Sequence, residues 1–265
     1  MNDDIILFVK FGEKKHIAQL LNGKMYFSNA EKFRGIEKET GLKGQGDAYE
    51  AVLRFGSGQA IWIDEVTGRM GYIPKVEANI QFEDTYKIPV FCITQIKASD
   101  CFVEEKNGKS FLKVNNAVVG TIKSHFPKAD AAGVFFSPAQ FLYSVSKLGV
   151  TMCDQVRYFD FAPKGDVRKM LEYISQNTGA INKRNEQIIS SIEVMGDGDQ
   201  KRTSVTKNNM KRILFCKDSY FSVEKEYRII LPNKRINTPQ HYYVRWGKLK
   251  RKLYPIEEFF SGIEI

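Results

Sequence analysis

The sequence predicts an α+β fold in a single domain, and its opening segment gives the clearest signal. Residues 5–11 form a short apolar run typical of a strand. Residues 13–22 carry apolar side chains at helical spacing, and Asn22-Gly23 supplies a helix stop. Residues 24–28 then resume a strand-like run. Later segments also alternate between short apolar runs and amphipathic stretches, which is the mixture that defines the class.

The remaining elements follow from the same periodicities. Residues 88–96, Ile-Pro-Val-Phe-Cys-Ile-Thr-Gln-Ile, form the most strand-like run and are expected to be buried. Ser137-Pro138 is a typical helix entry. The polar residues 35–46 are expected to form a loop. We expect further strands over residues 49–55, 60–64, 155–161, 221–231 and 242–246, and helices over residues 137–148 and 166–176.

The domain organisation is predicted to be a single unit spanning residues 1–265. The chain contains no internal repeat and no obvious linker, and its length suits one large domain. Residues 177–209 are polar and contain Met-Gly-Asp-Gly-Asp, so we expect a mobile insert there, the one candidate boundary.

Composition indicates a cytoplasmic protein. Hydrophobic residues make up 43% of the chain, which is enough for a sizeable core, yet no window approaches the roughly 18 apolar residues of a membrane helix. The acidic N-terminal residues lack the basic region of a secretory signal. The four cysteines are scattered and only three histidines are present, so we expect neither a disulfide framework nor a metal site.

The positive charge is concentrated near the C-terminus. The formal net charge is +9, but residues 201–252 hold 15 Lys or Arg against 3 acidic residues, a net charge of +12. The remainder, with 25 basic and 28 acidic residues, carries −3. This asymmetry favours a polyanionic partner or a negatively charged substrate, with a solvated basic face as the alternative.

One row of charged residues is the sharpest candidate for chemistry. If residues 221–231 form a strand, Glu224, Glu226 and Arg228 share one face, because side chains alternate. Two carboxylates and a guanidinium in one row can hold a polar ligand, and one carboxylate can raise the pKa of the other. The alternative is an exposed strand whose charges pair with each other.

A second candidate is the segment from residue 241 to residue 252, where aromatic and basic side chains interleave. Such a pattern can stack bases while neutralising phosphates. The alternative is an edge strand whose lysines discourage aggregation. The candidate nucleic-acid contacts are Tyr243, Arg245, Trp246, Lys248, Lys250 and Arg251.

Four segments of the chain form a pattern when they are read together: Lys10 in the first strand, residues 23–28 (Gly-Lys-Met-Tyr-Phe-Ser), residues 89–94 (Pro-Val-Phe-Cys-Ile-Thr) and residues 221–228 (Phe-Ser-Val-Glu-Lys-Glu-Tyr-Arg). This pattern resembles divergent ADP-ribosyltransferases among bacterial and phage proteins linked to toxins or phage defence. It covers about a third of the chain. It implies an ADP-ribosyltransferase-like pair of small mixed sheets with flanking helices. Lys10 stands where Arg or His is usual, and no Ser-Thr-Ser triplet is present.

The resemblance also implies roles for individual residues, with NAD as the substrate and no metal. Glu226 would be the catalytic carboxylate beside the nicotinamide ribose, where glycosidic cleavage develops positive charge. Glu224 would orient the acceptor. Lys10 would meet the phosphates of NAD, and Tyr26 with Phe27 would border the nicotinamide. The full set implied for NAD binding is Lys10, Tyr26, Phe27, Ser28 and Arg228.

The function expected from these observations is an NAD-dependent effector that modifies a nucleic acid or a protein, held in check by an inhibiting partner protein. The alternative is a non-catalytic nucleic-acid-binding module with a basic C-terminal segment. A nuclease is disfavoured, because the sequence shows no acidic cluster with metal-ligand spacing.

Overall fold

The computed structural model describes residues 4–40, 46–63, 67, 70–82, 85–160, 167–175, 188–195, 200–206 and 209–265. These residues form helices and several antiparallel sheets, so the predicted α+β class is confirmed.

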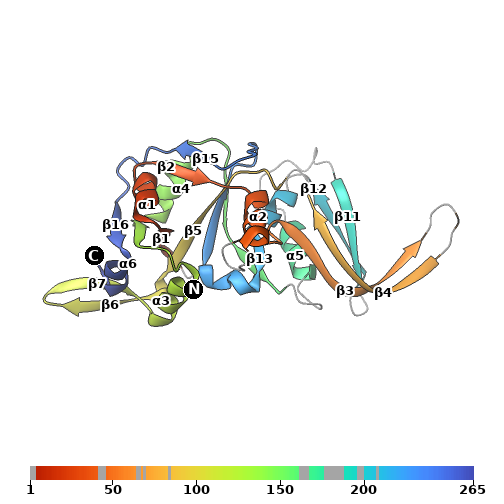
Figure 1. The fold of residues 1–265 in the computed structure, drawn as a ribbon, viewed down its shortest axis with the longest axis horizontal. Helices are drawn as coiled ribbons and strands as arrows, with labels where there is room; N and C mark the ends of the chain where they lie inside the picture. The colour runs from red at the N-terminus through yellow and green to blue at the C-terminus, as the bar shows by residue number, and fades with distance from the viewer. Residues whose placement is uncertain are drawn as a thin grey trace.

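A six-stranded antiparallel sheet forms the centre of the molecule (Figure 1). It brings together strands from the two ends of the chain, since the first strand and a late strand both pair with the same mid-chain strand. The order across the sheet is β16 (Arg251–Pro255), β8 (Ala131–Phe135), β1 (Ile5–Gly12), β5 (Val90–Lys97), β14 (Glu226–Ile230) and β9 (Met152–Gln155).

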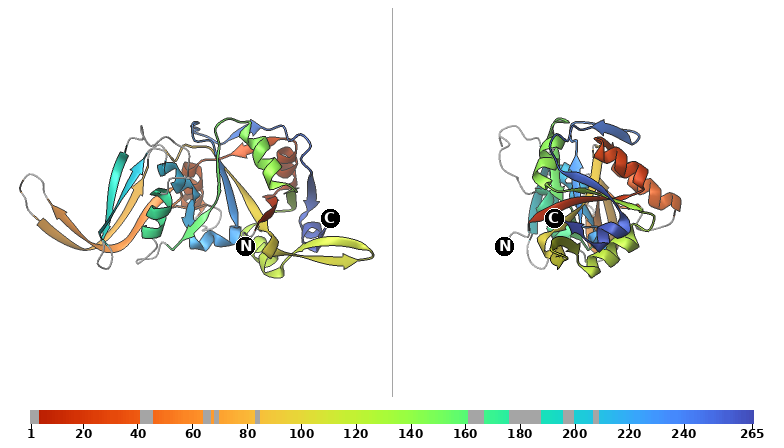
Figure 2. Two further views of the ribbon diagram at one scale, coloured as in Figure 1. Left: turned by 180° about the vertical axis from the view of Figure 1, so that it is seen from behind. Right: turned by 90° about the vertical axis from the view of Figure 1, so that its left-hand side faces the viewer.

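Helices cover this sheet and the region beside it (Figure 2). The first helix packs on β8 and β16, and the fourth packs on β1. Ser137 caps that fourth helix, because its hydroxyl accepts a 3.3 Å hydrogen bond from the backbone N–H of Gln140. The helices are α1 (Lys14–Leu21), α2 (Ala30–Thr40), α3 (Asn116–His125), α4 (Pro138–Ser146), α5 (Val167–Ser175) and α6 (Ile256–Ser261).

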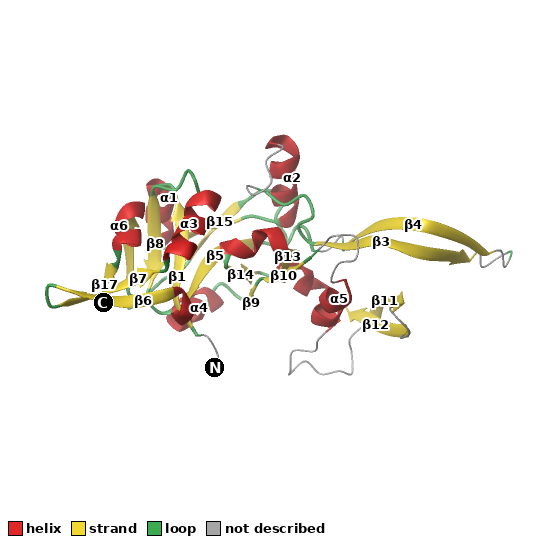
Figure 3. Cartoon of the chain, turned by 90° about the horizontal axis from the view of Figure 1, so that it is seen from below, coloured by secondary structure: helices red, strands yellow, loops and turns green. Residues whose placement is uncertain are grey.

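Five smaller sheets complete the described residues, where the resemblance implied only a pair of mixed sheets. Figure 3 shows the long β3–β4 hairpin extending away from the central sheet. The pairs are β3 (Val52–Ile63) with β4 (Met70–Gln81), β2 (Lys24–Phe27) with β15 (Gln240–Tyr243), β11 (Ile188–Met195) with β12 (Gln200–Thr206), and β10 (Arg157–Phe159) parallel to β13 (Cys216–Asp218). The last sheet joins β6 (Cys101–Lys106), β7 (Lys109–Val114) and β17 (Ile263–Glu264).

Several local predictions differ from the structure. The loop expected over residues 35–46 is helical as far as Thr40, and residues 41–45 lie outside the described part. The strand expected over residues 221–231 begins only at Glu226, because Ser219–Glu224 is a 3-10 helix. Within residues 177–209, the structure describes the β11–β12 hairpin and Asn209, and the rest of the expected insert lies outside the described residues.

The core lies on both faces of the central sheet. Alternation along β1 sends Phe8 to one face, where it meets the rings of Phe141 and Tyr227, and sends Leu7 and Val9 to the other. Among the described residues, no helix is both long and apolar enough to cross a membrane.

Gly23 joins α1 to β2, and its backbone permits no side chain. Its φ is 93°, and a Cβ there would lie 2.2 Å from the carbonyl oxygen of Val244. We expect Gly23→Ala to lower the free energy of unfolding by about 1–3 kcal/mol from backbone strain, plus the cost of that contact. Gly108→Ala is the matched control, because Gly108 also has a positive φ, 71°, but a Cβ added there would meet no atom within 4 Å. Chemical denaturation measures both, and equal losses would contradict the predicted steric contribution.

Candidate active site

A cavity opens where β1 and β5 separate. Their ladder ends at the pair Val9–Thr94. The next residue, Lys10, places its ammonium 2.7 Å from the backbone oxygen of Cys92, which accepts a hydrogen bond. The cavity holds about 230 Å³, and its wall also includes Glu224 and Glu226 from the other end of the chain. Two segments that are distant in sequence therefore face the same space.

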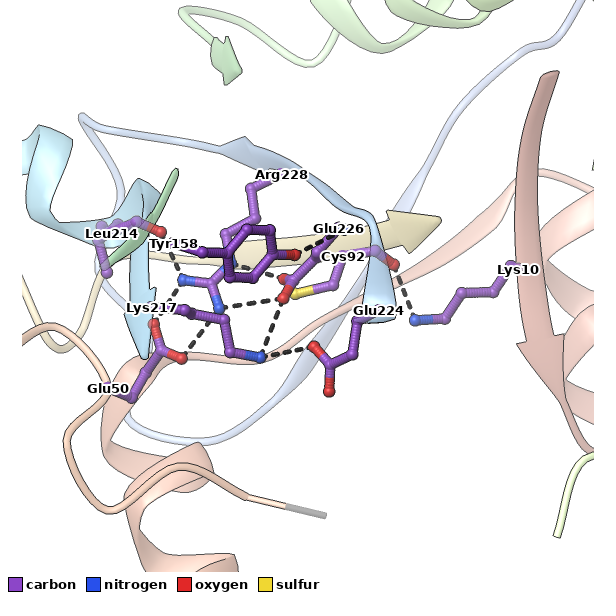
Figure 4. Close-up of polar contacts among 9 residues, drawn as sticks. All are labelled: Lys10, Glu50, Cys92, Tyr158, Leu214, Lys217, Glu224, Glu226 and Arg228. Carbon is purple, nitrogen blue, oxygen red and sulfur yellow. Dashed lines mark hydrogen bonds and ion pairs between the residues drawn. The ribbon is translucent and has the colours of Figure 1, made fainter. Parts of the chain in front are cut away.

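The floor of this cavity is a buried network of charges around Arg228 (Figure 4). Arg228 is only 1% exposed. Its Nε donates to Glu226 Oε1 at 2.6 Å, and its Nη2 donates to Glu50 Oε2 at 2.9 Å. Lys217, on β13, donates to Glu224 at 2.7 Å and to Glu226 at 3.1 Å. We call Glu50, Lys217, Glu224, Glu226 and Arg228, together with Asp47 beside them, the charge cluster.

The charge cluster holds four carboxyl groups and two cations, so two negative charges would remain if all four ionised. Burial alone would raise the pKa of Glu226, but Arg228 and Lys217 outweigh it and hold this pKa well below its ordinary value. Burial raises the pKa of Glu224 to about 7 although Lys217 opposes it. Burial, and then the charge of Glu50, also raise the pKa of Asp47 to about 7. Ionised and protonatable carboxyl groups thus line one cavity.

A left-handed turn positions Glu224 relative to Glu226. The intervening residue, Lys225, has φ 46° and ψ 46°, which is a costly conformation for a residue with a side chain. Its ammonium lies 2.6 Å from the buried carboxylate of Asp100, and its carbonyl accepts from the backbone N–H of Gln95. These contacts anchor the turn, so that both glutamates reach the ammonium of Lys217.

Asp47 carries a buried oxygen with unused bonding capacity. It is 4% exposed and lines the cavity. Its Oδ1 accepts from the backbone N–H of Tyr49 at 2.9 Å, whereas its Oδ2 has no hydrogen-bond partner among the described residues. A buried oxygen left in this way costs stability and is a natural contact for a ligand hydroxyl or amide.

A larger cavity of about 830 Å³ adjoins the first one. Both cavities share Lys10, Phe11 and Phe126 as lining residues, so these three mark the junction. The wall of the larger cavity combines apolar surface with basic and imidazole side chains. These are Lys10, His16, Lys24, His125, Lys128 and His241. A phosphate-bearing ligand would find matching charge there.

The structure separates the residues that the resemblance assigned to NAD. Lys10, Glu224, Glu226 and Arg228 do meet at the smaller cavity. Tyr26 lines only the larger cavity.

Phe27 and Ser28, which the resemblance also assigned to NAD, line neither cavity. Phe27 is completely buried in the core against Phe91 and Tyr242. Ser28 is buried and forms a backbone bridge with Val90. The next residue, Asn29, caps α2, because its Oδ1 accepts a hydrogen bond from the backbone N–H of Lys32.

The basic C-terminal candidates also divide into exposed and structural residues. Trp246 is 4% exposed, stacks on Phe141 and donates to the backbone oxygen of Leu20, so it cannot stack on a base. Arg251 donates from its guanidinium to the backbone oxygens of Leu21 and Leu249. The remaining candidates, Tyr243, Arg245, Lys248 and Lys250, are exposed.

Three members of the charge cluster were missed from the sequence. Asp47 and Glu50 follow a glycine-containing polar stretch that resembled an ordinary loop, and Lys217 lies on the short strand β13. The spacing Asp-x-x-Glu next to glycine was the one available signal. Among the described residues, no group of three or more His, Cys, Asp or Glu side chains has the geometry to hold a metal ion.

The raised pKa of Asp47, caused by burial and by the charge of Glu50, predicts a pH-dependent stability. Because its pKa rises from the ordinary value of about 4 to about 7 in the folded state, Asp47 contributes stability below about pH 4 that is lost as the pH rises through about 7. Asp47→Asn keeps the acceptor for Tyr49 and removes the charge. We expect the variant to be more stable than the wild type by about 1–3 kcal/mol at pH 8, with the difference vanishing near pH 4. Urea denaturation across this range measures it, and an Asn variant less stable at pH 8 would contradict the assignment.

Comparison with known proteins found no match: neither a protein-family model, nor a curated protein, nor a solved structure is significantly similar to this chain.

Proposed function

We propose that the chain is an NAD-consuming ADP-ribosyltransferase, which cleaves the bond between nicotinamide and ribose and transfers the ADP-ribosyl group to a nucleic acid or a protein. One observation carries the proposal. Lys10 and the Glu224–Glu226 pair, which lie near opposite ends of the chain, line the same cavity. The sequence resemblance requires these residues to share one site. The sheets differ from the implied pair of small mixed sheets, since one six-stranded sheet is accompanied by five smaller ones.

The ionised carboxylate of Glu226 suits the bond-breaking step. When the bond from C1′ to the nicotinamide nitrogen breaks, the electron pair leaves with the nicotinamide, which departs as a neutral molecule. Positive charge then develops on the ribose. Because Arg228 and Lys217 keep Glu226 ionised, a fixed negative charge stands at the floor of the cavity before the reaction begins. A preorganised charge of this kind favours the transition state.

Glu224 suits the second step, in which a nucleophile attacks C1′. The attacking hydroxyl must lose a proton, and a carboxylate with a pKa near 7 is matched to accepting one at neutral pH. Lys10 lines the same cavity and has further N–H donors beyond the one bound to Cys92, and these can meet the phosphates of NAD. Asp47 offers its unpaired oxygen to a ribose hydroxyl or to the nicotinamide amide.

The biological setting that we propose follows from the sequence resemblance alone. It is that of a cytoplasmic toxin or phage-defence effector, restrained by an inhibiting partner protein.

Incubation of the purified protein with NAD tests the proposal. With label on the nicotinamide, we expect release of free nicotinamide. With label on the adenylate, we expect transfer to a component of total RNA or of a cell extract. If the protein neither releases nicotinamide nor transfers label under any of these conditions, the proposal fails.

A further inference from the structure

One face of the β2–β15 ribbon displays exposed aromatic rings beside a partly buried lysine, Lys24. The antiparallel register places His241 opposite Tyr26, and Tyr243 opposite Lys24. Directly opposed residues, and residues two positions along, point to the same side of a ribbon. The rings of Tyr26 and His241 are 5.2 Å apart, which agrees with this register. Tyr26 is 53% exposed and Tyr243 is 73% exposed, so two tyrosines present their rings to solvent on one face.

The opposite face of the ribbon is fixed to the core. Met25 and Phe27 are completely buried, and Tyr242 packs edge-on to the ring of Phe27. The carbonyl of Gly23 accepts a hydrogen bond from Val244 N–H at 2.8 Å, which ties the two strands together at one end. The exposed rings therefore stand on a rigid support, and little conformational entropy is lost when they stack on a ligand.

The ribbon leads directly into the larger cavity. Lys24, Tyr26 and His241 belong to the ribbon face and also line that cavity. Its far end is the junction at Lys10, which borders the charge cluster. Beyond the ribbon, three further exposed cations follow in the chain, namely Arg245, Lys248 and Lys250. The exposed tyrosine face therefore adjoins the larger cavity, and the larger cavity adjoins the carboxylates of the charge cluster.

We infer that the β2–β15 ribbon and the larger cavity bind single-stranded nucleic acid, with bases stacked on Tyr26 and Tyr243 and phosphates held by Lys24 and its basic neighbours. Exposed aromatic rings beside cations are the combination that binds unpaired strands without sequence preference. A duplex hides its base faces and cannot use the tyrosines. The role of this strand as the acceptor rests on the proposed function, whereas the binding itself does not.

Binding of a fluorescein-labelled oligouridylate of about twelve nucleotides, followed by fluorescence anisotropy at low salt, tests this inference. We expect Tyr26→Ala and Tyr243→Ala each to weaken binding by roughly 5- to 100-fold, the loss of one stacked base. Lys24→Gln should reduce the slope of log affinity against log salt concentration by about one. Tyr143→Ala is the matched control, because Tyr143 is equally exposed but lies on α4 and lines neither cavity.

Unchanged binding in both tyrosine variants, absence of binding at low salt, or a duplex bound as tightly as the single strand would each overturn the inference. Nicotinamide release measured without oligonucleotide keeps the two proposals separate. Tyr143 lies on α4 and lines neither cavity, so Tyr143→Ala should release nicotinamide like the wild type. A protein that binds the strand but never consumes NAD would support this inference and reject the transferase, leaving a non-catalytic nucleic-acid-binding module.

Discussion

Replacing Arg228 with methionine is expected to lower the free energy of unfolding by about 3–5 kcal/mol, the cost of breaking a buried ion pair by removing one partner. Arg228 is the cation that Glu50 and Glu226 share, and it also donates to the backbone oxygen of Leu214. Methionine fills similar volume without charge, so both carboxylates would be left buried with fewer partners. Urea denaturation at neutral pH measures the loss.

Two comparisons identify the cause of that loss. Arg245→Met removes an exposed arginine and should change stability by less than about 0.5 kcal/mol. The triple variant Glu50→Gln, Glu226→Gln, Arg228→Met removes the charges on both sides, and it should recover a substantial part of the lost stability, because uncharged groups replace the uncompensated ones. If the triple variant is no more stable than Arg228→Met alone, the penalty does not come from unpaired charge.

The charge row shows what the sequence could predict. Strand alternation correctly placed Glu226 and Arg228 on one face, because both lie on β14 and bond to each other. It failed for Glu224, which ends a 3-10 helix and reaches the cluster through the left-handed turn at Lys225. Nothing in the local pattern distinguishes that turn from a continuing strand, since its contact with Asp100 joins segments 125 positions apart.

The burial of the row was equally hard to foresee. Charges in alternation usually indicate a solvated face, yet Arg228 is enclosed because Glu50 approaches it from a segment 178 positions away. A single sequence carries no information about such a partner. Propensity does locate the turn and helix signals that depend on neighbours alone, such as Asn22-Gly23 after α1 and Ser137-Pro138 before α4.

The segment from residue 241 to residue 252 also shows what a single sequence leaves undetermined. Its composition indicated stacking and phosphate contacts, but composition does not say which rings face solvent. In the structure the strand register exposes Tyr243 and turns Tyr242 inward, while Trp246 fills the core against Phe141. The exposed partner ring comes from Tyr26, which the resemblance had assigned to nicotinamide instead.

For the transferase activity that we propose, replacing Glu224 with glutamine is expected to reduce ADP-ribosyl transfer by about 10²- to 10³-fold, within the range for removal of a general base. The amide oxygen can still accept from Lys217, and Lys217 retains Glu226, so the fold should persist. Release of nicotinamide by hydrolysis should fall less, because the charge of Glu226 remains. The wild-type rate should rise with pH through about 7, as Glu224 loses its proton, and the variant should lack this rise.

Glu257→Gln is the control, since Glu257 is exposed and pairs with Lys123. Full transfer activity in Glu224→Gln, with an unchanged pH profile, would remove Glu224 from the mechanism.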